Sequence, residues 1–345
     1  MSLHYRISKE IMKIYIVIPN WNGKSRLKSC LDAVKAQSLK CSVVVVDNGS
    51  KDGSVEYLKK NYPEVELIEH KVNKGFAGGV NAGIKYALDK GADYIALLNN
   101  DAVIDKDWAK ELVNCLEQNS HIGAATCKLL GPKGGSIDST GDQYSIWGLP
   151  IARQRGEAPE KAPNSPEEVF GACAGASVYR SKMFREVGLL DETFFAYYED
   201  SDLNFRMQLL DWGAMYWPKA TADHAIGGTS GSIKGFTTFQ TTKNLPMVFF
   251  KNVPLGLMPR LLPRFFLAYY LVLGHSIFAG RGWPAIKGHV YWLFYIPITL
   301  IKRFKIQRSK RVSNQYILSI LFHDLPPDAQ KLRTFRKIFT LGIVK

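Results

Sequence analysis

The chain contains one short stretch whose residue types suit metal and phosphate chemistry. Four apolar residues, Ile95 to Leu98, run directly into Asn99, Asn100 and Asp101. On an extended backbone Asn99 and Asp101 face the same side, because alternate side chains share one face of a strand. Carboxylate and amide oxygens held in this way suit a hard cation such as Mg²⁺ or Mn²⁺, which often also takes phosphate oxygens of a substrate. The same residues are ordinary turn formers, so the stretch alone leaves a solvated turn as an alternative.

A second acidic cluster comprises Glu199, Asp200 and Asp202, and apolar residues follow it at helical spacing. We therefore expect these acids in the first turn of a helix, where carboxylates cap free N–H groups and complement the helix dipole. Three acids in four positions exceed what capping requires. A carboxylate whose proton affinity is raised by burial and by like-charged neighbours can also act as a general base. The cluster alone leaves capping and catalysis open.

Two further segments are candidates for phosphate contact. Residues 75–83 hold four glycines beside Lys74, and we expect a loop there with a helix from about Asn81 to Lys90. Glycines permit close backbone approach, and a helix N-terminus offers N–H groups and the positive end of the dipole, which together with Lys74 suit a diphosphate. His224 precedes a segment rich in glycine and hydroxyl groups, residues 227–231, and is a candidate for metal or phosphate contact. A ligand-free loop and a structural histidine are the alternatives.

The elements that position these residues alternate between strands and helices. Strands are predicted at residues 13–19, 43–46, 65–69 and 94–98, with helices and short connections between them. This alternation favours an open, mostly parallel α/β sheet flanked by helices, whose ligands bind beyond the carboxyl ends of the strands. Neither a dinucleotide fingerprint nor a P-loop is present. The residues after strands one, two and four should line one crevice: Asn20 and Asn22, Asp47 and Asn48, and Asn99 and Asp101.

The later part of the sheet region has fewer clear signals. Residues 131–168 are rich in glycine, proline and serine, and we expect surface excursions over the sheet there. A helix is predicted at residues 180–187, ending before Gly188, and a late strand at residues 212–218. The five cysteines are scattered and form no C-x-x-C pair, which indicates reduced thiols in a cytosolic compartment. No apolar stretch of signal-peptide length precedes Ile14, so no secretory signal is expected.

The positive charge of the chain is concentrated in its last hundred residues. Residues 243–345 carry 17 of the 45 Lys and Arg but only 2 of the 31 acidic residues, which leaves the first 242 residues with 28 basic and 29 acidic side chains. Such an asymmetry predicts a tail that meets an anionic surface. No nucleic-acid reader module is recognisable, so nucleic acid is not expected as a partner. We predict one unit at residues 1–242 and a basic, aromatic-rich helical unit at residues 243–345.

The tail combines apolar runs with clusters of cations. Its longest uninterrupted apolar stretch, residues 265–274, has ten residues, whereas a membrane-spanning helix needs about 20. Six Lys and Arg residues follow within positions 302–311. Aromatic and aliphatic anchors beside cations predict helices that lie in the interface of an anionic membrane. An ordinary helical subdomain with a solvated basic face, or the interface of a homo-oligomer, is the alternative.

The ordered set of motifs from Ile14 to Ser230 resembles the inverting nucleotide-sugar glycosyltransferases of family 2, which have the GT-A fold. The resemblance rests on I-V-I-P-N-W-N-G, V-V-V-D-N-G-S, N-K-G-F-A-G-G-V-N-A-G, L-L-N-N-D, G-A-C-A-G-A and F-F-A-Y-Y-E-D-S-D-L. Within the family the chain is most similar to bacterial rhamnosyltransferases, which build cell-wall linkers and surface polysaccharides on lipid carriers.

The resemblance implies a role for each candidate residue. Asp200 corresponds to the catalytic base, with Glu199 and Asp202 as neighbours. Asp101 corresponds to the last residue of the family's D-x-D motif and would ligate the metal, and His224 matches a position that can contact the metal or the diphosphate. Asp47 would recognise the nucleotide base. Asn99 stands where the family's D-x-D motif has its first aspartate, which lowers the expected metal affinity. The implied nucleotide-sugar site comprises Pro19, Asn20, Asn22, Asp47, Asn48, Lys74, Gly75, Asn81, Asn99 and Asn100.

The resemblance also implies an activity and a location. The expected enzyme lies peripherally at the cytoplasmic face of the cell membrane and uses Mg²⁺ or Mn²⁺. It would move L-rhamnose from dTDP-rhamnose to a lipid-linked or polysaccharide acceptor, and the configuration would invert because there is one displacement. A transferase of the same fold with a UDP-sugar donor is one alternative. A non-catalytic scaffold that binds glycan or membrane is the other.

Overall fold

A computed structural model describes residues 12–225 and 233–324 of the chain. Its strands are β1 (Ile14–Asn20), β2 (Ser42–Asp47), β3 (Glu66–Glu69), β4 (Tyr94–Leu98), β5 (Ala102–Ile104), β6 (Ile122–Leu130), β7 (Ile137–Ser139), β8 (Asp142–Tyr144), β9 (Pro150–Ala152), β10 (Glu167–Val169), β11 (Ala176–Arg180) and β12 (Gly213–His224). Its α-helices are α1 (Lys24–Lys35), α2 (Ser54–Asn61), α3 (Gly75–Asp89), α4 (Trp108–Gln118), α5 (Ser181–Val187), α6 (Glu199–Leu209), α7 (Phe236–Asn252), α8 (Met258–Ser276), α9 (Gly282–Ser309) and α10 (Asn314–Ile320).

One mixed sheet organises the described residues. Its main path runs β10-β12-β6-β11-β4-β1-β2-β3, with β5 paired to β12 and β7 to β6, while β8 and β9 form a separate pair. Strands β4, β1, β2 and β3 are parallel to one another, and β11 runs antiparallel between β4 and β6. The predicted α/β sheet is therefore confirmed, and its antiparallel strands make it mixed.

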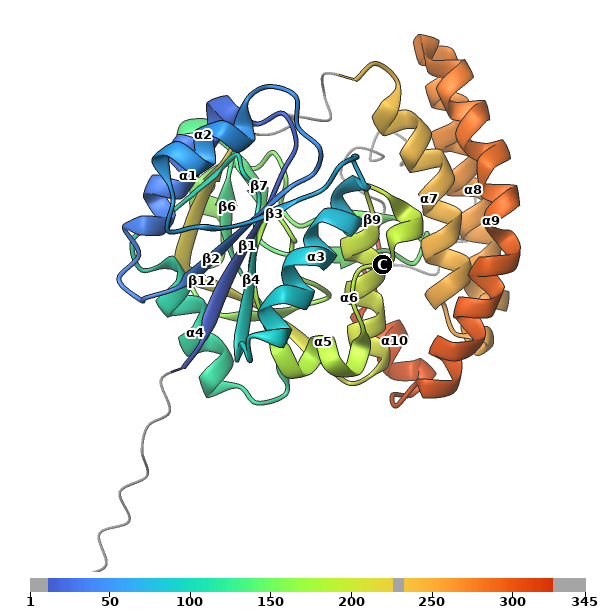
Figure 1. The fold of residues 1–345 in the computed structure, drawn as a ribbon. Coiled ribbons are helices and arrows are strands. Elements are labelled where there is room, and N and C mark those ends of the chain that lie inside the picture. The colour runs from blue at the N-terminus through green and yellow to red at the C-terminus, as the bar shows by residue number, and fades with distance from the viewer. Residues whose placement is uncertain (1–11, 226–232, 325–345) are drawn as a thin grey trace, which may run out of the picture.

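Helices cover both faces of the sheet, as Figure 1 shows. Apolar residues of α1, α2 and α4 belong to one buried cluster, and those of α3, α5 and α6 belong to another on the opposite face. The continuous valines of β2, Val44 to Val46, are fully buried, as expected of a strand covered on both faces. The strand predicted at residues 94–98 matches β4 in both bounds.

The glycine-rich segment differs from the prediction, because it forms the first turns of α3 and not a loop before a helix. A Cβ added at Gly83 would lie 2.3 Å from Cγ1 of Val17, and one at Gly79 would lie 3.3 Å from the Asn48 amide. The glycines thus let α3 pack directly on the parallel strands. Tertiary packing outweighs the poor helix propensity of glycine, which costs about 1 kcal/mol per residue relative to alanine.

Residues 131–168 also depart from the prediction of surface excursions. The run from Ile137 to Thr140 is buried, as are Asp142, Tyr144 and Ser145. β7 pairs with the end of β6, and Asp142 exchanges backbone hydrogen bonds with Gly171. The segment enters the interior because its polar groups find partners there: Ser139 Oγ donates to the Gly141 carbonyl at 2.9 Å.

The C-terminal region is helical, and α7, α8 and α9 lie side by side along one flank (Figure 1). Pro263 lies inside α8 and Pro297 lies inside α9, so neither proline ends its helix. A turn with a left-handed residue, Gly280 at φ +76°, joins these two helices. We call α8, this turn and α9 the hairpin. Within the described residues, Leu255–Ser309 is long and apolar enough to cross a membrane, by length and composition. Its most apolar stretch of 18 residues has a mean hydropathy of 1.4, and 28% of that stretch is buried.

The helices of the flank share a hydrophobic core with the sheet region. Phe194, Phe205 and Leu209 belong to the same buried cluster as Phe249 and Phe265 of the flank. Gly288 of α9 allows close approach to α7, because a Cβ there would lie 2.1 Å from Oγ1 of Thr242. The boundary predicted between residues 242 and 243 falls inside α7, so the division into two units stays a prediction.

The close packing of α3 on the sheet makes a stability prediction. Gly83→Ala should lower the free energy of unfolding by about 1 to 3 kcal/mol, because the added methyl group overlaps Val17. Gly274→Ala in α8 is the matched control, since a Cβ there has nothing within 4 Å. The control should be neutral or stabilising by up to ~1 kcal/mol. Urea unfolding of both variants measures the difference, and equal midpoints would contradict the packing argument.

Candidate active site

A cavity of about 870 Å³ opens beyond the carboxyl ends of β1 and β4, next to the N-terminus of α6. Ten of the residues singled out from the sequence line it. They are Pro19, Asn20, Asn48, Gly75, Asn99, Asn100, Asp101, Glu199, Asp200 and His224.

The polar ends of three neighbouring strands meet through hydrogen bonds. Asn20 Nδ2 donates to Asp47 Oδ2 at 2.9 Å, and Asn100 Nδ2 donates to Asn20 Oδ1 at 2.7 Å. These contacts join β1, β2 and the residues after β4. The predicted convergence is met in part: Asn20, Asn48, Asn99 and Asp101 line the cavity, whereas Asn22 lines neither cavity. Asp47 itself lines an adjoining cavity of about 350 Å³ together with Ser50 and His70.

Asn48 fixes the start of α3. Its Nδ2 donates to the Gly75 carbonyl at 2.8 Å, and its Oδ1 accepts from the Lys74 backbone N–H at 3.0 Å. The Lys74 side chain is exposed and lines neither cavity. Gly75 is left-handed at φ +76°, and an added Cβ would lie 2.2 Å from the Phe195 carbonyl oxygen. The start of α3 thus touches the loop that leads into α6.

Two other predicted residues have structural contacts. Asn22 is exposed, and its Oδ1 accepts from the Lys51 backbone N–H at 2.8 Å. Asn81 is buried and lines neither cavity, because α3 begins before it and turns its side chain towards Leu190. Its Nδ2 donates to the Leu190 carbonyl at 2.8 Å, and its Oδ1 accepts from the Leu190 N–H at 3.0 Å. The structure therefore places Asn81 as a link between α3 and residue 190, away from the predicted nucleotide-sugar site.

His224 stands between two carboxylates. Its Nε2 lies 3.1 Å from Asp101 Oδ1 and 3.3 Å from Asn99 Nδ2, and its Nδ1 lies 2.8 Å from Asp138 Oδ2. Asp138 also forms an ion pair with Arg155 at 2.8 Å. Burial alone would lower the pKa of His224, but the hydrogen bonds to Asp101 and Asp138 outweigh burial and raise the pKa to about 9.

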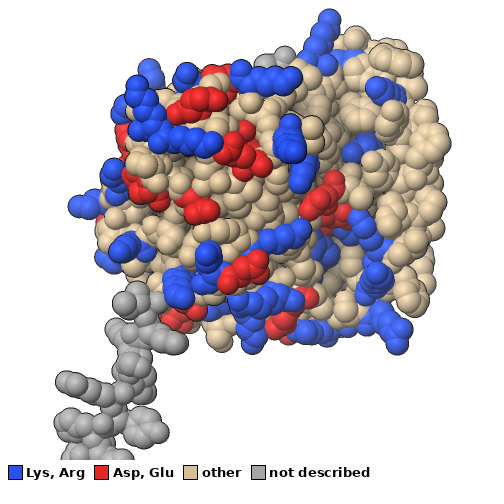
Figure 2. Space-filling model, in the orientation of Figure 1, with Lys and Arg blue, Asp and Glu red and all other residues tan. Residues whose placement is uncertain are grey.

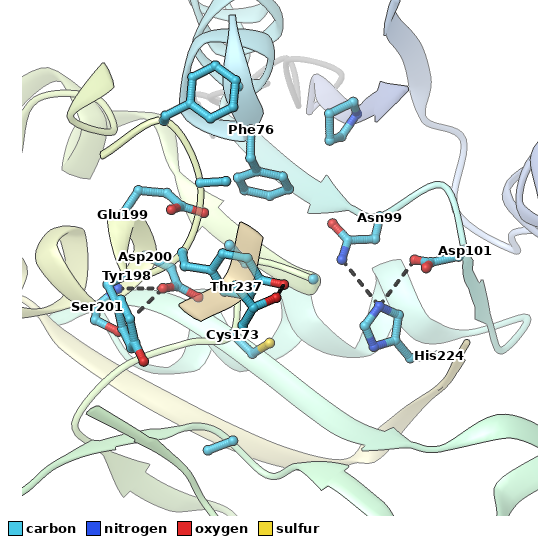
Figure 3. A pocket seen from close by; sticks show the side chains of 18 of the residues that line it. Phe76, Asn99, Asp101, Cys173, Tyr198, Glu199, Asp200, Ser201, His224 and Thr237 are labelled. Carbon is cyan, nitrogen blue, oxygen red and sulfur yellow. Dashed lines mark hydrogen bonds and ion pairs between the residues drawn. The ribbon is translucent and has the colours of Figure 1, made fainter. Parts of the chain in front are cut away.

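The Asp101 carboxylate and the His224 imidazole lie at one region of the cavity, and Figure 3 shows Asn99 beside them. An oxygen and an imidazole nitrogen fit Mg²⁺ or, better, Mn²⁺. No group of three or more His, Cys, Asp or Glu residues with the geometry of a metal site occurs among residues 12–225 and 233–324. The protein would thus supply few of the ligands, and substrate phosphate oxygens would have to supply others. The glycine- and hydroxyl-rich residues 227–231 lie outside the described residues.

The acidic cluster occupies the first turn of α6, as predicted. Glu199 and Asp200 face the cavity, whereas Asp202 does not line it. Residues two apart on a helix are rotated by roughly 200°, so Asp200 and Asp202 project in opposite directions. Burial, reinforced by the charge of Asp200, raises the pKa of Glu199 to about 8. The pKa of Asp200 is raised by burial, although the Ser201 backbone N–H that it accepts at 2.7 Å opposes the shift.

Asp202 belongs to a buried network of ions. Its carboxylate accepts from Arg206 at 2.9 Å and from Lys251 Nζ at 2.8 Å. The same Lys251 contacts Asp191 at 2.5 Å, and Lys302 of α9 also contacts Asp191 at 2.5 Å. Burial opposes ionisation of Asp202, but Lys251 and Arg206 outweigh it and lower the pKa of this carboxyl. Asp202, predicted as a supporting acid, therefore ties α6 to α7, and Lys302 of α9 joins the network through Asp191.

The loop before α6 has an unusual backbone. Phe195, Tyr197 and Tyr198 have φ values of +66°, +68° and +71°, which are uncommon outside glycine. Asn244 of α7 holds this loop, because its Nδ2 donates to the carbonyls of residues 194, 196 and 197 at 3.1, 2.9 and 2.8 Å. Lys243 Nζ donates to the Phe194 carbonyl at 3.2 Å. The helical flank therefore positions the segment that carries Asp200.

Several of these residues were missed from the sequence. Asp138, Asp142 and Arg155 line the cavity from the segment that was expected on the surface. The alternation of Ile137, Asp138 and Ser139 could have predicted a short strand there. Asn244 was counted with the basic tail, although a lone amide within an apolar run is a candidate for a buried hydrogen-bonding role.

Comparison with known proteins identifies the sheet region. Residues 15–188 match the pattern of Glycosyl transferase family 2. The chain is 28% identical over 225 residues to the dTDP-rhamnosyl transferase RfbF of Shigella flexneri, which covers 64% of this chain and 72% of the relative. It is 26% identical over 212 residues to the N-acetylglucosaminyl-diphospho-decaprenol L-rhamnosyltransferase of Mycobacterium tuberculosis, with 55% and 68% covered.

A further relative and a solved structure extend the comparison. The chain is 26% identical over 198 residues to the low-salt glycan biosynthesis hexosyltransferase Agl10 of Haloferax volcanii, covering 55% of this chain and 60% of that protein's length. Its fold resembles that of the mannosyltransferase PcManGT from Pyrobaculum calidifontis, solved with GDP-Man and Mn²⁺, at a TM-score of 0.52 and 14% identity over 90% of this chain and 86% of the other. The fold is GT-A. The chain belongs to Glycosyl transferase family 2.

Proposed function

We propose that this glycosyltransferase moves L-rhamnose from dTDP-rhamnose to a hydroxyl of a lipid-linked or polysaccharide acceptor, with inversion of configuration. The carrying observation is that two groups of different chemistry line one cavity. Figure 3 displays Glu199 and Asp200 on one side and Asn99, Asp101 and His224 on the other. A base on one side and a binding site for an anionic leaving group on the other is the arrangement that a single displacement requires.

Asp200 is the proposed base. It would accept the proton of the acceptor hydroxyl while that oxygen attacks the anomeric carbon of the donor sugar. The bond from this carbon to the diphosphate oxygen breaks on the opposite face, so one displacement inverts the configuration. Glu199 retains a proton near neutral pH because of its raised pKa. A neutral Glu199 leaves Asp200 as the ionised member of the pair, since two adjacent buried carboxylates resist simultaneous ionisation.

The other predicted residues that line the two cavities would bind the donor. Asp101 and His224 would hold a divalent cation, with Asn99 beside them, once the cation displaces the proton between His224 Nε2 and Asp101, and the cation would neutralise charge that develops on the leaving diphosphate. The exposed Lys74 beside the start of α3 would act on the same charge, whereas the backbone N–H groups of Lys74, Gly75 and Ala77 already have partners within the protein. Asp47 would recognise the nucleotide base in the adjoining cavity. Asn20 and Asn100, which hydrogen-bond to each other, would line the passage between the two.

The choice of donor and acceptor rests on the relatives. The Shigella relative is named a dTDP-rhamnosyl transferase, and the mycobacterial one acts on a sugar attached through a diphosphate to a lipid. Both are less than 30% identical to this chain, so donor assays must include UDP-sugars and GDP-sugars beside dTDP-rhamnose. Release of nucleoside diphosphate from none of these donors, with or without acceptor, would contradict an enzymatic function.

The hairpin supports a membrane-bound acceptor. Its exposed apolar side chains include Phe278, Trp283 and Phe294, which are 93%, 75% and 76% exposed. Residues 233–323 contain no acidic residue. Figure 2 shows few charges on the flank that carries α8 and α9, with Lys and Arg towards its lower end. An apolar face bordered by cations fits the interface of an anionic membrane, and we propose that the enzyme is peripheral at the cytoplasmic face.

The base assignment predicts a selective loss of turnover. Asp200→Asn should lower kcat by about 10²- to 10⁴-fold, the usual contribution of a general base, while the donor Kd stays within about twofold of the wild-type value. Asp211→Asn is the matched control: this exposed residue follows α6 and has φ +67°, which asparagine accepts. Product formation and donor titration measure the two effects. Wild-type turnover of Asp200→Asn would remove this residue from the mechanism.

The raised pKa of Glu199 predicts a pH-dependent stability. The folded chain keeps a proton that the unfolded chain releases near the usual pKa of about 4.3. This stabilisation is fully present below that pH and is lost as the pH rises through about 8. Glu199→Gln should therefore reduce the fall in melting temperature between about pH 5 and pH 8.5. The exposed Glu160→Gln serves as control and should follow the wild type; an unchanged slope in Glu199→Gln would contradict the shift.

The hairpin predicts the binding of vesicles. Replacing Phe278 and Trp283 together by serine should reduce the bound fraction at least ~10-fold on vesicles that contain phosphatidylglycerol, since burying each aromatic side chain contributes roughly 1.5–3 kcal/mol. Val72→Ser is the control, because Val72 is 65% exposed but lies outside the hairpin. Flotation in sucrose measures binding, and added salt should weaken it. Undiminished flotation of the double variant would rule out this face as the membrane contact.

A further inference from the structure

Asp142, the first residue of β8, is a buried acid in the wall of the cavity that the proposed reaction leaves without a role. It is 8% exposed. Its Oδ2 accepts a hydrogen bond from Asn204 Nδ2 at 3.1 Å. Among the described residues no ion pair holds this carboxyl: Arg155 and His224 pair with Asp138 instead, and the charge of Arg155 acts on Asp142 only at longer range. Burying a carboxyl group without a cation is costly, which calls for a functional explanation.

The position of Asp142 is tied to that of Asp200 through α6. Asn204, its partner, is four residues after Asp200, so both project from one face of the helix about 6 Å apart along the axis. The segment from Ala172 to Ala174 contacts both residues: the Ala172 N–H donates to Asn204 Oδ1 at 3.2 Å, and the Ala174 N–H donates to Asp200. The charge of Asp200 raises the pKa of Asp142, so the two carboxyls lie near each other in the wall of the cavity.

The backbone around Asp142 is fixed. Its N–H donates to the Gly171 carbonyl at 2.8 Å, and the Gly171 N–H donates back to the Asp142 carbonyl at 3.2 Å. Gly171 leaves room for the partner amide, since a Cβ there would lie 2.1 Å from Cγ of Asn204. The carboxyl is thus held at a defined place in the wall, as a group that recognises a ligand must be.

The environment also sets the hydrogen-bonding character of this carboxyl. Burial, and then the negative charge of Asp200, raise the pKa of Asp142 well above its usual value. The neutral form that such surroundings favour can donate one hydrogen bond and accept others. A sugar hydroxyl likewise donates and accepts, so it matches a neutral carboxyl better than a phosphate or a cation does.

We propose that Asp142 binds the acceptor-sugar hydroxyl adjacent to the one that Asp200 deprotonates. The inference rests on the proposed function and defines its acceptor as a sugar with two neighbouring hydroxyl groups. Two such groups, each hydrogen-bonded to one carboxyl, would connect Asp142 with Asp200 along the cavity wall that both residues line. Asp142 thereby selects which hydroxyl reaches the base. A sugar that lacks the hydroxyl adjacent to the reacting one is a poor acceptor.

The test combines variants of Asp142 with modified acceptors. The probe is N-acetylglucosaminyl diphosphate linked to a short alkyl chain, together with its monodeoxy analogues. With the wild type, the analogue that lacks the reacting hydroxyl gives no product, and the analogue that lacks the adjacent hydroxyl should lose about 10- to 100-fold in kcat/KM. Asp142→Ala should lose the same factor in kcat/KM on the complete acceptor. On the analogue that lacks the adjacent hydroxyl, the kcat/KM of Asp142→Ala should equal that of the wild type. Independent, multiplying losses would overturn the inference, because interacting groups must show coupling.

Two controls separate this role from misfolding and from failure of the proposed function. Asp142→Asn keeps the size of the side chain and an oxygen for Asn204, so it should fold like the wild type and show a weaker acceptor defect than Asp142→Ala. Asp89→Ala, at the exposed end of α3, should leave kcat/KM unchanged. Donor hydrolysis without acceptor should be equal in all variants. A wild type inactive on every donor contradicts the proposed function, whereas active enzyme with wild-type acceptor kinetics in Asp142→Ala overturns only the inference.

Discussion

The buried ion network around Lys251 is the interaction on which the arrangement of the site depends. Lys251 lies between Asp202 and Asp191, and Lys302 contacts the far side of Asp191. These four residues join α6, the segment before its loop, α7 and α9. Leaving one member of such a buried network without its partners typically costs about 3–5 kcal/mol, so the network strongly favours this one placement of the helices. The helical flank is therefore part of the structure that supports α6, the helix that carries Asp200.

The network also explains how a strained loop persists beside Asp200. Backbone conformations such as those of Phe195, Tyr197 and Tyr198 cost of order 1–3 kcal/mol each and survive only where surrounding contacts compensate. Asn244 compensates with three hydrogen bonds to loop carbonyls. Because Lys251 fixes α7 on α6, Asn244 stays under the loop. The loop in turn positions the first turn of α6. There the adjacent carboxyls of Glu199 and Asp200 are buried, and the pair tends to keep one proton.

Much of the sheet and one edge of the site could be predicted from the sequence. Continuous apolar runs locate β1, β2 and β4, and the topology of parallel strands brings Asn20, Asp47 and Asn100 together without any further information. The start of α3 could not be predicted in the same way, because its glycines are poor helix formers whose role appears only against Val17. Asn81 was predicted as a ligand for the same reason. The predicted helix began near Asn81, whereas α3 begins at Gly75.

The acceptor side of the cavity was less predictable, since it depends on contacts between distant segments. Asp142 is held by a residue 62 positions later, and Asp138 meets His224 across 86 positions. No local pattern encodes such pairs. The opposite orientations of Asp200 and Asp202 follow from helix geometry alone, but of the two cations that pair with Asp202 one, Lys251, comes from the distant helix α7. Asn244 shows that composition can mislead, because a basic tail defined by its charge includes a residue that shapes the active site.

The contact between Gly75 and Phe195 bears on attempts to engineer the enzyme. An added Cβ at Gly75 would collide with the Phe195 carbonyl oxygen at 2.2 Å and with its ring at 2.7 Å. In the proposed function the start of α3 lies on the donor side, and the loop at Phe195 leads to the helix that carries the proposed base. The two segments thus pack directly against each other. A chimera that exchanges donor specificity must therefore transplant α3 together with residues 194–198 and Asn244, which holds them.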